Sequence, residues 1–439
     1  MTNTPTSGRR ILSLALPALG SLLAEPLMVL GDSAMIGHVG TAALAGLTVA
    51  SSVNVLITGM CIFLVYSTTA VAARKLGEGD QAGAVKTGVD GMWLGLIVGI
   101  ILASAVFMLA PWIMSLFGTD QAVAREGIRY LRASSGSLVG MMWVLAGTGA
   151  LRGQLDTKTP LIISVFGAIA NVLFNAVFIF ALHMGVAGAG VGTTLACTGM
   201  GLAFMGKVIR GARLSGVAMH PEFHGILGAL GSGIPLMIRT ATMQAVIMAT
   251  VWVAASQGTV AAAGRQIANS TWSLTSNILD ALAIAGQALV GFELGHGDET
   301  RVRGLVTTLT TWGVIAGLCI GLIQAPAAFF WPQLFSLDPD VVAGARIALW
   351  VAAAFMPLAG IVYMYDGILI GANDGWYLAV AGLVNMALYA PSLAAVWLWA
   401  PDGAAGLGWL WACYCGVFFL ARFLTLGLRL RTNGWTHLS

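Results

Sequence analysis

Residues 91–110, GMWLGLIVGIILASAVFMLA, form a run of 20 positions without a charged side chain. A helix rises about 1.5 Å per residue, so this run is long enough to cross the roughly 30 Å hydrocarbon core of a bilayer. Similar runs recur along all 439 residues, of which 58% are apolar and 9% charged. Soluble domains carry roughly a quarter charged residues, and in lipid a segment must satisfy its own backbone hydrogen bonds. The sequence therefore predicts an all-α integral membrane protein.

Apolar runs between charged or Gly/Pro-rich breaks predict twelve transmembrane helices. Their expected ranges are 11–37, 42–73, 84–115, 122–150, 158–182, 187–209, 225–256, 259–292, 301–331, 340–370, 376–400 and 404–429. The helix over 259–292 contains several polar residues, so we expect it to line an interior cavity rather than face lipid all round.

The distribution of Lys and Arg predicts the orientation. With a cytoplasmic N-terminus, 14 of the 21 basic residues fall on the inner side: Arg9, Arg10, Arg74, Lys75, Lys86, Arg152, Lys158, Lys207, Arg210, Arg213, Arg301, Arg303, Arg429 and Arg431. Basic loops stay in the cytoplasm. We therefore expect a multi-pass protein of the plasma (inner) membrane with both termini cytoplasmic. The first apolar run lacks a cleavage site of small residues, which favours a retained helix over a signal peptide.

An internal repeat is visible at a single offset of 218 residues. LGEGD at 76–80 aligns with LGHGD at 294–298, and VGTAALAG at 39–46 aligns with QGTVAAAG at 257–264. Pro17 aligns with Pro235. Rows of glycines spaced by four, at 91, 95 and 99 and at 313, 317 and 321, predict close helix packing.

Six helices per half is an even number, so both halves enter the membrane from the same side. This predicts two six-helix bundles related by a pseudo-two-fold axis along the membrane normal, with a substrate path between them. We expect an N-terminal lobe over 1–213, a cytoplasmic linker over 214–224 and a C-terminal lobe over 225–439. This architecture is typical of alternating access.

Ionisable residues within apolar helices are costly and indicate function by default. Asp32 lies in the first helix, and burial favours the neutral form of a carboxyl group, so Asp32 could carry a proton or bind a sodium ion. Glu25 lies seven residues earlier on nearly the same face and is a candidate cavity residue. Pro17 and Pro26 each remove a backbone hydrogen bond and are candidate bending positions, with a static kink as the alternative.

The second half contains its own buried polar candidates. Asp280, Asp366, Arg239 and Asn277 are expected to face a substrate cavity, although Arg239 could equally pair with one of the acids. In the first half, Asn171 and Asn175 are four residues apart and share one helical face, as neutral ligands or hydrogen-bond partners could, so both are candidate ion-coupling residues. Asp90 is expected to form an ordinary salt bridge with Lys86.

Motifs for other functions are missing from the sequence. It contains no Walker loop, no cluster of Cys and His with metal-ligand spacing and no G-x-S-x-G. It also lacks a basic tract interleaved with aromatic residues. We therefore expect neither an enzyme nor a nucleic-acid partner, and no cofactor beyond H⁺ or Na⁺ as the coupling ion.

The run Pro26-Leu27-x4-Asp32-x3-Ile36-Gly37-His38-x-Gly40 resembles the multidrug and toxic compound extrusion (MATE) family. Within that family the chain is similar to the DNA-damage-inducible, DinF-like branch. Supporting segments are ALRGQLDTKTP at 150–160, LDALAIAGQALVG at 279–291 and YDGILIGANDG at 365–375. The likeness covers essentially the whole chain.

The resemblance implies export of organic cations or other toxic compounds in exchange for H⁺ or Na⁺. It matches the family's functional aspartate to Asp32 and its bending proline to Pro17. It further assigns ion-coupling positions to Tyr130, Asn171 and Thr193. Some members carry a second carboxylate four residues after that asparagine, where this chain has Asn175, and Glu25 is the candidate to replace it.

Two further hypotheses remain beside the cation exporter, which is expected to work as a monomer in the bilayer. A lipid or glycan-lipid flippase of a related fold would need a cationic cavity, for which Arg239 and Arg265 are candidates. A membrane-embedded enzyme would need a catalytic cluster, and the sequence has none.

Overall fold

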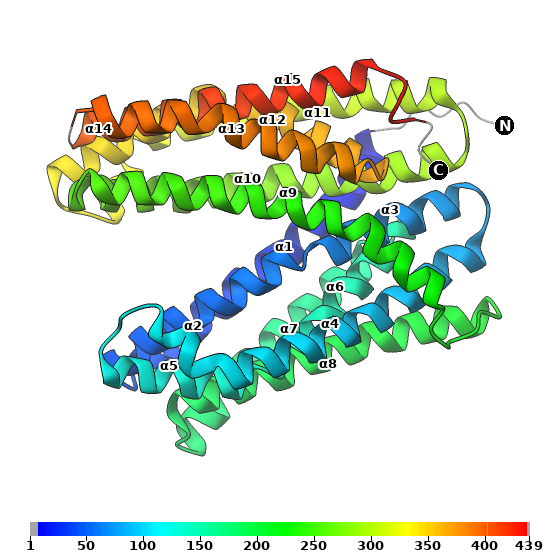
Figure 1. Ribbon diagram of the computed structural model, residues 1–439, viewed down its shortest axis with the longest axis horizontal. Coiled ribbons are helices and arrows are strands. Elements are labelled where there is room, and N and C mark those ends of the chain that lie inside the picture. Colours follow the sequence, from blue (N-terminus) through cyan, green and yellow to red (C-terminus); the bar gives the residue numbers. More distant parts are fainter. Residues whose placement is uncertain (1–7, 402, 437–439) are drawn as a thin grey trace. The chain divides into compact units, whose positions relative to one another are not determined.

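The fold is helical throughout the part of the chain that the structure describes. The computed structural model describes residues 8–401 and 403–436, apart from the side chains of Glu25 and His224. Every regular element within these ranges is a helix (Figure 1). Among the described residues, eleven helices are long and apolar enough to cross a membrane, or twelve if one bent pair forms a single span. The predicted all-α membrane class is confirmed.

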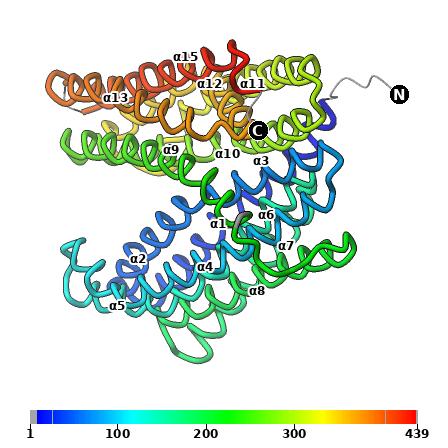
Figure 2. The backbone as a smooth tube through the Cα atoms, turned by 45° about the vertical axis from the view of Figure 1, so that its right-hand side comes forward, coloured from blue at the N-terminus to red at the C-terminus, as the bar shows by residue number. Residues whose placement is uncertain are grey.

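The chain divides into two compact units, whose paths Figure 2 shows as a continuous tube. Unit N comprises Leu16–Ile234, and unit C comprises Pro235 onward together with the start of α1 up to Ala15. Both divisions lie within two residues of a proline that the repeat aligns, Pro17 or Pro235. The lobe boundaries 1–213 and 225–439 stay a prediction.

The described residues of the first half contain eight α-helices and one π-helical turn. They are α1 (Gly8–Gly37), α2 (Thr41–Met60), α3 (Phe63–Gly77), α4 (Gln81–Ser115), α5 (Gln121–Ser134), α6 (Ser137–Gly153), α7 (Lys158–Ala176), η1 (Val177–Ala181) and α8 (Gly185–Leu214).

The described residues of the second half contain seven α-helices, one 3-10 helix (η2) and one π-helical segment (η3). They are α9 (Phe223–Ser256), α10 (Thr259–Gly295), α11 (Glu299–Ala327), η2 (Trp331–Leu334), α12 (Pro339–Gly371), α13 (Gly375–Trp399), α14 (Ala404–Ala412), η3 (Cys413–Phe418) and α15 (Phe419–Arg431).

Two predicted spans of unit N are interrupted, which the apolar pattern did not predict. A turn between α2 and α3 divides the second predicted span, and the fourth predicted span bends by 52° between α5 and α6. At this bend, Ser135 Oγ donates to the Arg132 carbonyl at 2.9 Å and Ser137 Oγ donates to the Ser134 carbonyl at 2.6 Å. Serine side chains that bond back to the preceding turn, next to Gly136, are a known cause of helix bending.

The backbone repeats at the offset found in the sequence. Helices α2, α4 and α5 begin at residues 41, 81 and 121, and α10, α11 and α12 begin 218 residues later at 259, 299 and 339. Left-handed backbone positions recur in the same register: Gly79 and Gly297, Leu155 and Asn373, Gly185 and Gly403. The packing repeats as well, because α6 contacts α4 and α8, whereas α12 contacts α11 and α14.

The LGxGD motif has the same local role in both halves. Asp80 Oδ1 accepts a hydrogen bond from the Gly83 N–H at 2.7 Å, and Asp298 Oδ1 accepts one from the Arg301 N–H at 3.1 Å. Each aspartate thereby caps the N-terminus of the helix that follows, satisfying a donor that has no intrahelical partner.

The glycine rows are packing seams, as predicted. A Cβ at Gly99 would lie 2.8 Å from Val139 Cα, and one at Gly313 would lie 2.6 Å from the Gly360 carbonyl oxygen. Only a residue without a side chain permits α4 to approach α6, and α11 to approach α12, this closely.

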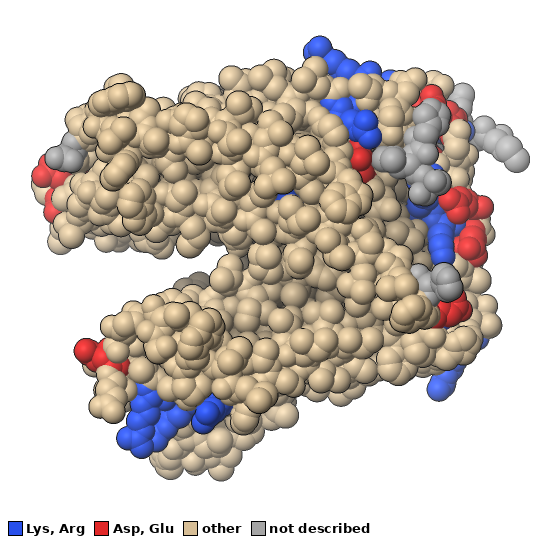
Figure 3. Space-filling model, viewed as in Figure 1, with Lys and Arg blue, Asp and Glu red and all other residues tan. Residues whose placement is uncertain are grey.

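Charged side chains lie mainly near helix ends. In Figure 3 most of the visible surface is neither acidic nor basic. Exposed apolar side chains such as Ile101, Met108 and Leu322, which are 61%, 75% and 73% exposed, cover the middle of long helices. This surface suits contact with lipid rather than with water.

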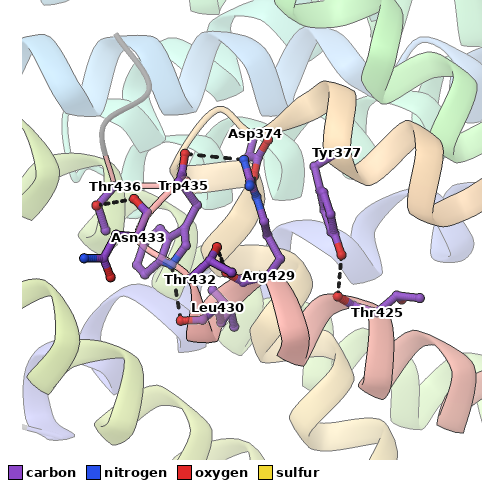
Figure 4. A network of polar contacts seen from close by, with 10 residues as sticks. Asp374, Tyr377, Thr425, Arg429, Leu430, Thr432, Asn433, Trp435 and Thr436 are labelled. Atoms are coloured by element: carbon purple, nitrogen blue, oxygen red, sulfur yellow. Dashed lines mark hydrogen bonds and ion pairs between the residues drawn. The ribbon is translucent and has the colours of Figure 1, made fainter.

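The C-terminal segment is fastened to unit C through polar contacts (Figure 4). Arg429 Nε forms an ion pair with Asp374 Oδ2 at 2.7 Å and lies over the Tyr377 ring. The Tyr377 hydroxyl donates to the Thr425 carbonyl at 2.6 Å. Trp435 is 1% exposed and donates through Nε1 to the Leu430 carbonyl. Trp435 and Thr436, which follow α15, are therefore buried in unit C.

Candidate functional site

Asp32 of α1 is buried at the centre of a neutral polar cluster in unit N. It is 5% exposed. Asn175 Nδ2 donates to Asp32 Oδ1 at 2.5 Å, and Thr193 Oγ1 donates to Asp32 Oδ2 at 3.4 Å. Asn171 Nδ2 donates to Thr193 Oγ1 at 3.1 Å, and the Tyr130 side chain lies close to Thr193 and Asp32. The structure thus brings together all five residues expected at the ion-coupling site.

Local packing fixes the positions of these side chains. The four-residue spacing places Asn171 and Asn175 on one face of α7, and both are fully buried. Helix α8 approaches that face at Gly192, where a Cβ would overlap the Asn175 side-chain oxygen and lie 2.9 Å from its backbone nitrogen. Thr194 Oγ1 donates to the Ala133 carbonyl at 2.9 Å and holds α8 against α5.

The electrostatics of the two buried acids of unit N differ. Asp90 forms an ion pair with Lys86 at 3.1 Å, as predicted, whereas the hydrogen-bond partners of Asp32 are neutral. The amide and hydroxyl donors stabilise the charged form of Asp32 without cancelling its charge. Asn171 Oδ1 and Asn175 Oδ1 are buried without a hydrogen-bond partner, so each amide has a free acceptor.

Chemically, this cluster can hold either form of one carboxyl group. Charged Asp32 accepts from Asn175 and Thr193. A protonated carboxyl becomes a donor and needs an acceptor, which the free oxygen of Asn175 offers after rotation of the amide. No group of three or more His, Cys, Asp or Glu side chains is placed to hold a metal ion among the described residues. A sodium ion bound here would be coordinated by the Asp32 carboxylate together with neutral oxygens.

The helix-bending candidates and Glu25 also lie on α1. Pro17 and Pro26 both fall inside the continuous helix Gly8–Gly37. The side chain of Glu25 lies outside the described residues, so its expected role is not tested. The bending role of the two prolines stays a prediction.

In unit C, Asp366 is held by two arginines. Arg239 Nε donates to Asp366 Oδ1 at 3.1 Å, and Arg239 also contacts Asp366 Oδ2. Arg422 pairs with Asp366 Oδ2 at 3.2 Å. Arg239 therefore pairs with an acid, as the alternative interpretation of the sequence had it. Asp280 interacts with Arg422 and Tyr363, and Asn277 is half-buried on the same helix.

A cavity of about 310 Å³ lies within unit C. Its walls carry two arginines, several neutral polar groups and a group of aromatic rings. The lining residues are Met243, Ile247, Thr250, Arg265, Asn269, Trp272, Ser273, Ser276, Tyr363, Leu410, Trp411, Tyr414, Phe418, Phe419 and Arg422. Asp280, Asp366, Arg239 and Asn277 are not in this lining, and their contact with a substrate stays a prediction.

Sequence reasoning missed residues of both sites, among them Arg422 and Gly192. Arg422 was not singled out, although it is an isolated charge within the apolar run FFLARFLTL at 418–426. A count of every charge inside an apolar run would have found it. Gly192 gave no signal, because its importance depends on the side chain of another helix.

Comparison with known proteins identifies the family. The MatE family model matches residues 17–177 and 235–396, which together make up well over half of the chain. The chain belongs to the MatE family. The two matched stretches start at Pro17 and Pro235, so the family model covers the repeat twice in the register derived from the sequence.

Relatives of the MatE chain occur in plants and bacteria. Protein DETOXIFICATION 42 of Arabidopsis thaliana is 25% identical over 488 residues, covering 98% of this chain and 93% of that protein. DNA damage-inducible protein F of Escherichia coli is 25% identical over 408 residues, covering 90% of this chain and 88% of that protein. The resemblance stated from the motifs is confirmed.

Solved structures share the fold. The bent form of the Vibrio cholerae MATE transporter VcmN matches with a TM-score of 0.87 at 20% identity, covering 97% of this chain and 98% of that one. A MOP superfamily transporter from Pyrococcus furiosus matches with a TM-score of 0.83 at 19% identity, covering 98% and 96%. MatE proteins are membrane transporters, so the expectation of a multi-pass transporter rather than an enzyme is confirmed.

Proposed function

We propose that this MatE protein is a secondary active multidrug efflux transporter that exports organic cations in exchange for H⁺ or Na⁺. The observation that carries the proposal is Asp32, a buried carboxylate whose hydrogen-bond partners Asn175 and Thr193 are both neutral. Relatives named multidrug resistance protein, NorM of Thermotoga maritima and MdtK of Yersinia pseudotuberculosis, support the cargo class.

Exchange follows from competition for one charge. A buried carboxylate without a basic partner is costly, so it gains most from binding a cation. When cargo occupies the site, its positive charge neutralises Asp32. When an ion enters, it neutralises Asp32 instead and releases the cargo. Because cargo and ion neutralise the same carboxylate, binding of one weakens binding of the other. This competition couples export to ion entry.

The neighbours of Asp32 have defined roles in this proposal. Asn175 and Thr193 hold the carboxylate by donating to it, and Asn171 orients the Thr193 hydroxyl. Tyr130 closes the cluster from α5. Because Asn175 is neutral, one acid carries the exchanged charge. Alternating access of the two halves then moves the site between the two sides of the membrane.

Accumulation of ethidium in cells that lack their own efflux pumps tests this role. Cells expressing the chain should accumulate less ethidium, whereas Asp32→Asn, which keeps the shape but not the charge, should return accumulation to the level of cells without the protein. The matched control is Asp120→Asn, which removes an exposed acid that makes no side-chain cap bond. Export by Asp32→Asn at the unaltered rate, at equal protein levels in the membrane, would refute the proposed exchange.

Proteoliposomes identify the coupling ion. Export driven by an imposed pH gradient without sodium indicates H⁺, and export driven by a sodium gradient at equal pH indicates Na⁺. Orientation is part of the same proposal: the excess of Lys and Arg at one set of helix ends supports a cytoplasmic position for both termini. Protease accessibility of a tag at each end checks this placement.

A further inference from the structure

The cavity of unit C contains a positive charge for which the described residues provide no ion-pair partner. Arg265 of α10 lines the cavity and is 8% exposed. Within the described part of the chain it forms no ion pair or hydrogen bond, and its electrostatic neighbours are the phenol groups of Tyr414 and Tyr389. A buried guanidinium without an acid is costly, so it gains from a partner from outside the chain.

The other arginine in the lining, Arg422, has a charge that a carboxylate of the protein compensates. Arg422 pairs with Asp366 at 3.2 Å and lies over the rings of Phe418 and Phe419 at 5.7 and 5.5 Å. Its position is set by protein groups on both sides. Arg265 has neither an acid nor a ring beneath it, so its five N–H donors remain available to a ligand.

The remaining walls suit a flat apolar body. Trp272 meets Trp411 and Tyr414 edge-on with ring centroids 5.8 Å apart, and meets Phe419 at 5.3 Å. Rings in this arrangement form a rigid aromatic wall. Asn269 and Ser273 add neutral polar groups one and two helical turns from Arg265 on the same helix. At about 310 Å³ the cavity is at the small end of small-molecule sites.

We propose that this cavity binds aromatic carboxylates, with the carboxylate paired to the Arg265 guanidinium and the ring system packed against the wall formed by Trp272, Trp411 and Tyr414. Planar guanidinium and carboxylate groups form two parallel hydrogen bonds, which gives orientation as well as affinity. The cargo of unit C is therefore chemically distinct from the cations proposed for Asp32. A compound with a carboxylate on a flat ring is a ligand even when it carries no positive charge.

Binding to the purified full-length protein in nanodiscs of zwitterionic lipid tests the inference, with 2-naphthoate as the probe and 2-naphthamide as its neutral analogue. Calorimetric titration should give at least about tenfold tighter binding of the naphthoate, because the amide cannot form the charged pair. Equal affinities would overturn the proposal, and this comparison requires no variant.

Variants then locate the site. Arg265→Gln should abolish the preference for naphthoate, and Arg265→Lys should retain part of it because the charge remains but the paired donors are lost. Arg301→Gln is the matched control, since its side chain is 61% exposed and lies outside the cavity. Unchanged naphthoate binding in Arg265→Gln would overturn the assignment, and so would loss of the preference in the control.

The inference is independent of the antiport proposal. Titration uses no ion gradient, and Asp32→Asn should bind naphthoate with wild-type affinity. Loss of ethidium export with intact naphthoate binding leaves the carboxylate site standing. Intact ethidium export without any naphthoate preference removes the carboxylate site alone.

Discussion

Replacing Gly192 by alanine tests whether the position of Asn175 matters for export. The added Cβ would overlap Asn175 Oδ1 and lie 2.9 Å from its backbone nitrogen. Favourable contacts between non-bonded heavy atoms lie at about 3.5–4.0 Å. Helices α7 and α8 must therefore separate by about 0.6 Å to relieve the contact with the backbone nitrogen, and the overlapping Asn175 amide must also turn away, which breaks its 2.5 Å hydrogen bond to Asp32.

The expected magnitude follows from two costs. Overpacking a close helix contact destabilises a protein by about 1–3 kcal/mol. A hydrogen bond to a charged group contributes about 1.5–3 kcal/mol, so its loss should slow export about tenfold or more. Gly199→Ala is the matched control on the same helix, because nothing lies within 4 Å of a Cβ there. Alanine in place of an exposed helical glycine should raise stability slightly, by about 0.5–1 kcal/mol.

Two measurements on both variants decide the outcome. Ethidium accumulation in pump-deficient cells reports export, and the temperature of half-unfolding in detergent, followed by size-exclusion fluorescence, reports stability. We expect Gly192→Ala to export less ethidium and to unfold at a lower temperature than the wild type. We expect Gly199→Ala to equal or exceed the wild type in both measurements. Wild-type export by Gly192→Ala with an unchanged unfolding temperature would show that contact between α8 and Asn175 does not position the carboxylate.

The remaining predictions concern unit C. Asp366→Asn leaves Arg239 and Arg422 without their shared acid and should destabilise the protein by about 3–5 kcal/mol, visible as a lower yield of monodisperse protein; a yield equal to wild type would contradict the role of the pair. Gly317→Ala inserts a Cβ 2.7 Å from the Cα of a residue in α12 and should lower the half-unfolding temperature. Gly304→Ala on the same helix meets open space and should not lower the half-unfolding temperature. Equal half-unfolding temperatures of the two variants would contradict close packing of α11 against α12 at Gly317.

Much of this fold was predictable because lipid imposes simple rules. Apolar runs predicted the eleven described helices that are long enough to cross a membrane, and a twelfth span if the bent pair α5 and α6 counts as one. The matches at an offset of 218 residues predicted where helices would begin in the second half. The breaks at Cys61–Ile62 and at Ser135–Gly136 were not predictable from hydropathy. They depend on the choice between backbone and side-chain hydrogen bonds in a few residues, which leaves the apolar pattern unchanged.

The two sites differed in how far the sequence could specify them. Asp32, Asn171 and Asn175 stand out as polar residues in apolar helices, and the family resemblance added Thr193 and Tyr130 from helices that sequence spacing cannot relate. The sequence indicated Arg265 only as a candidate for the cationic cavity of a flippase. Its isolation depends on the acids: Asp366 pairs with Arg239 and Arg422, so it is not available to Arg265. Such a division among partners is a property of three-dimensional packing.

The neutrality of the partners around Asp32 sets a limit on the work that the transporter can perform. Asp90 is tied to Lys86, and in the proposed exchange with H⁺ the Asp32 carboxylate takes one proton for one monovalent cation in each cycle. Such a cycle moves no net charge, so the membrane voltage neither assists nor opposes it. The steepest cargo gradient then equals the proton gradient, about tenfold for each pH unit across the membrane. A doubly charged drug would have to be extruded against the voltage as well, at about 2.3 kcal/mol per 100 mV for the extra charge.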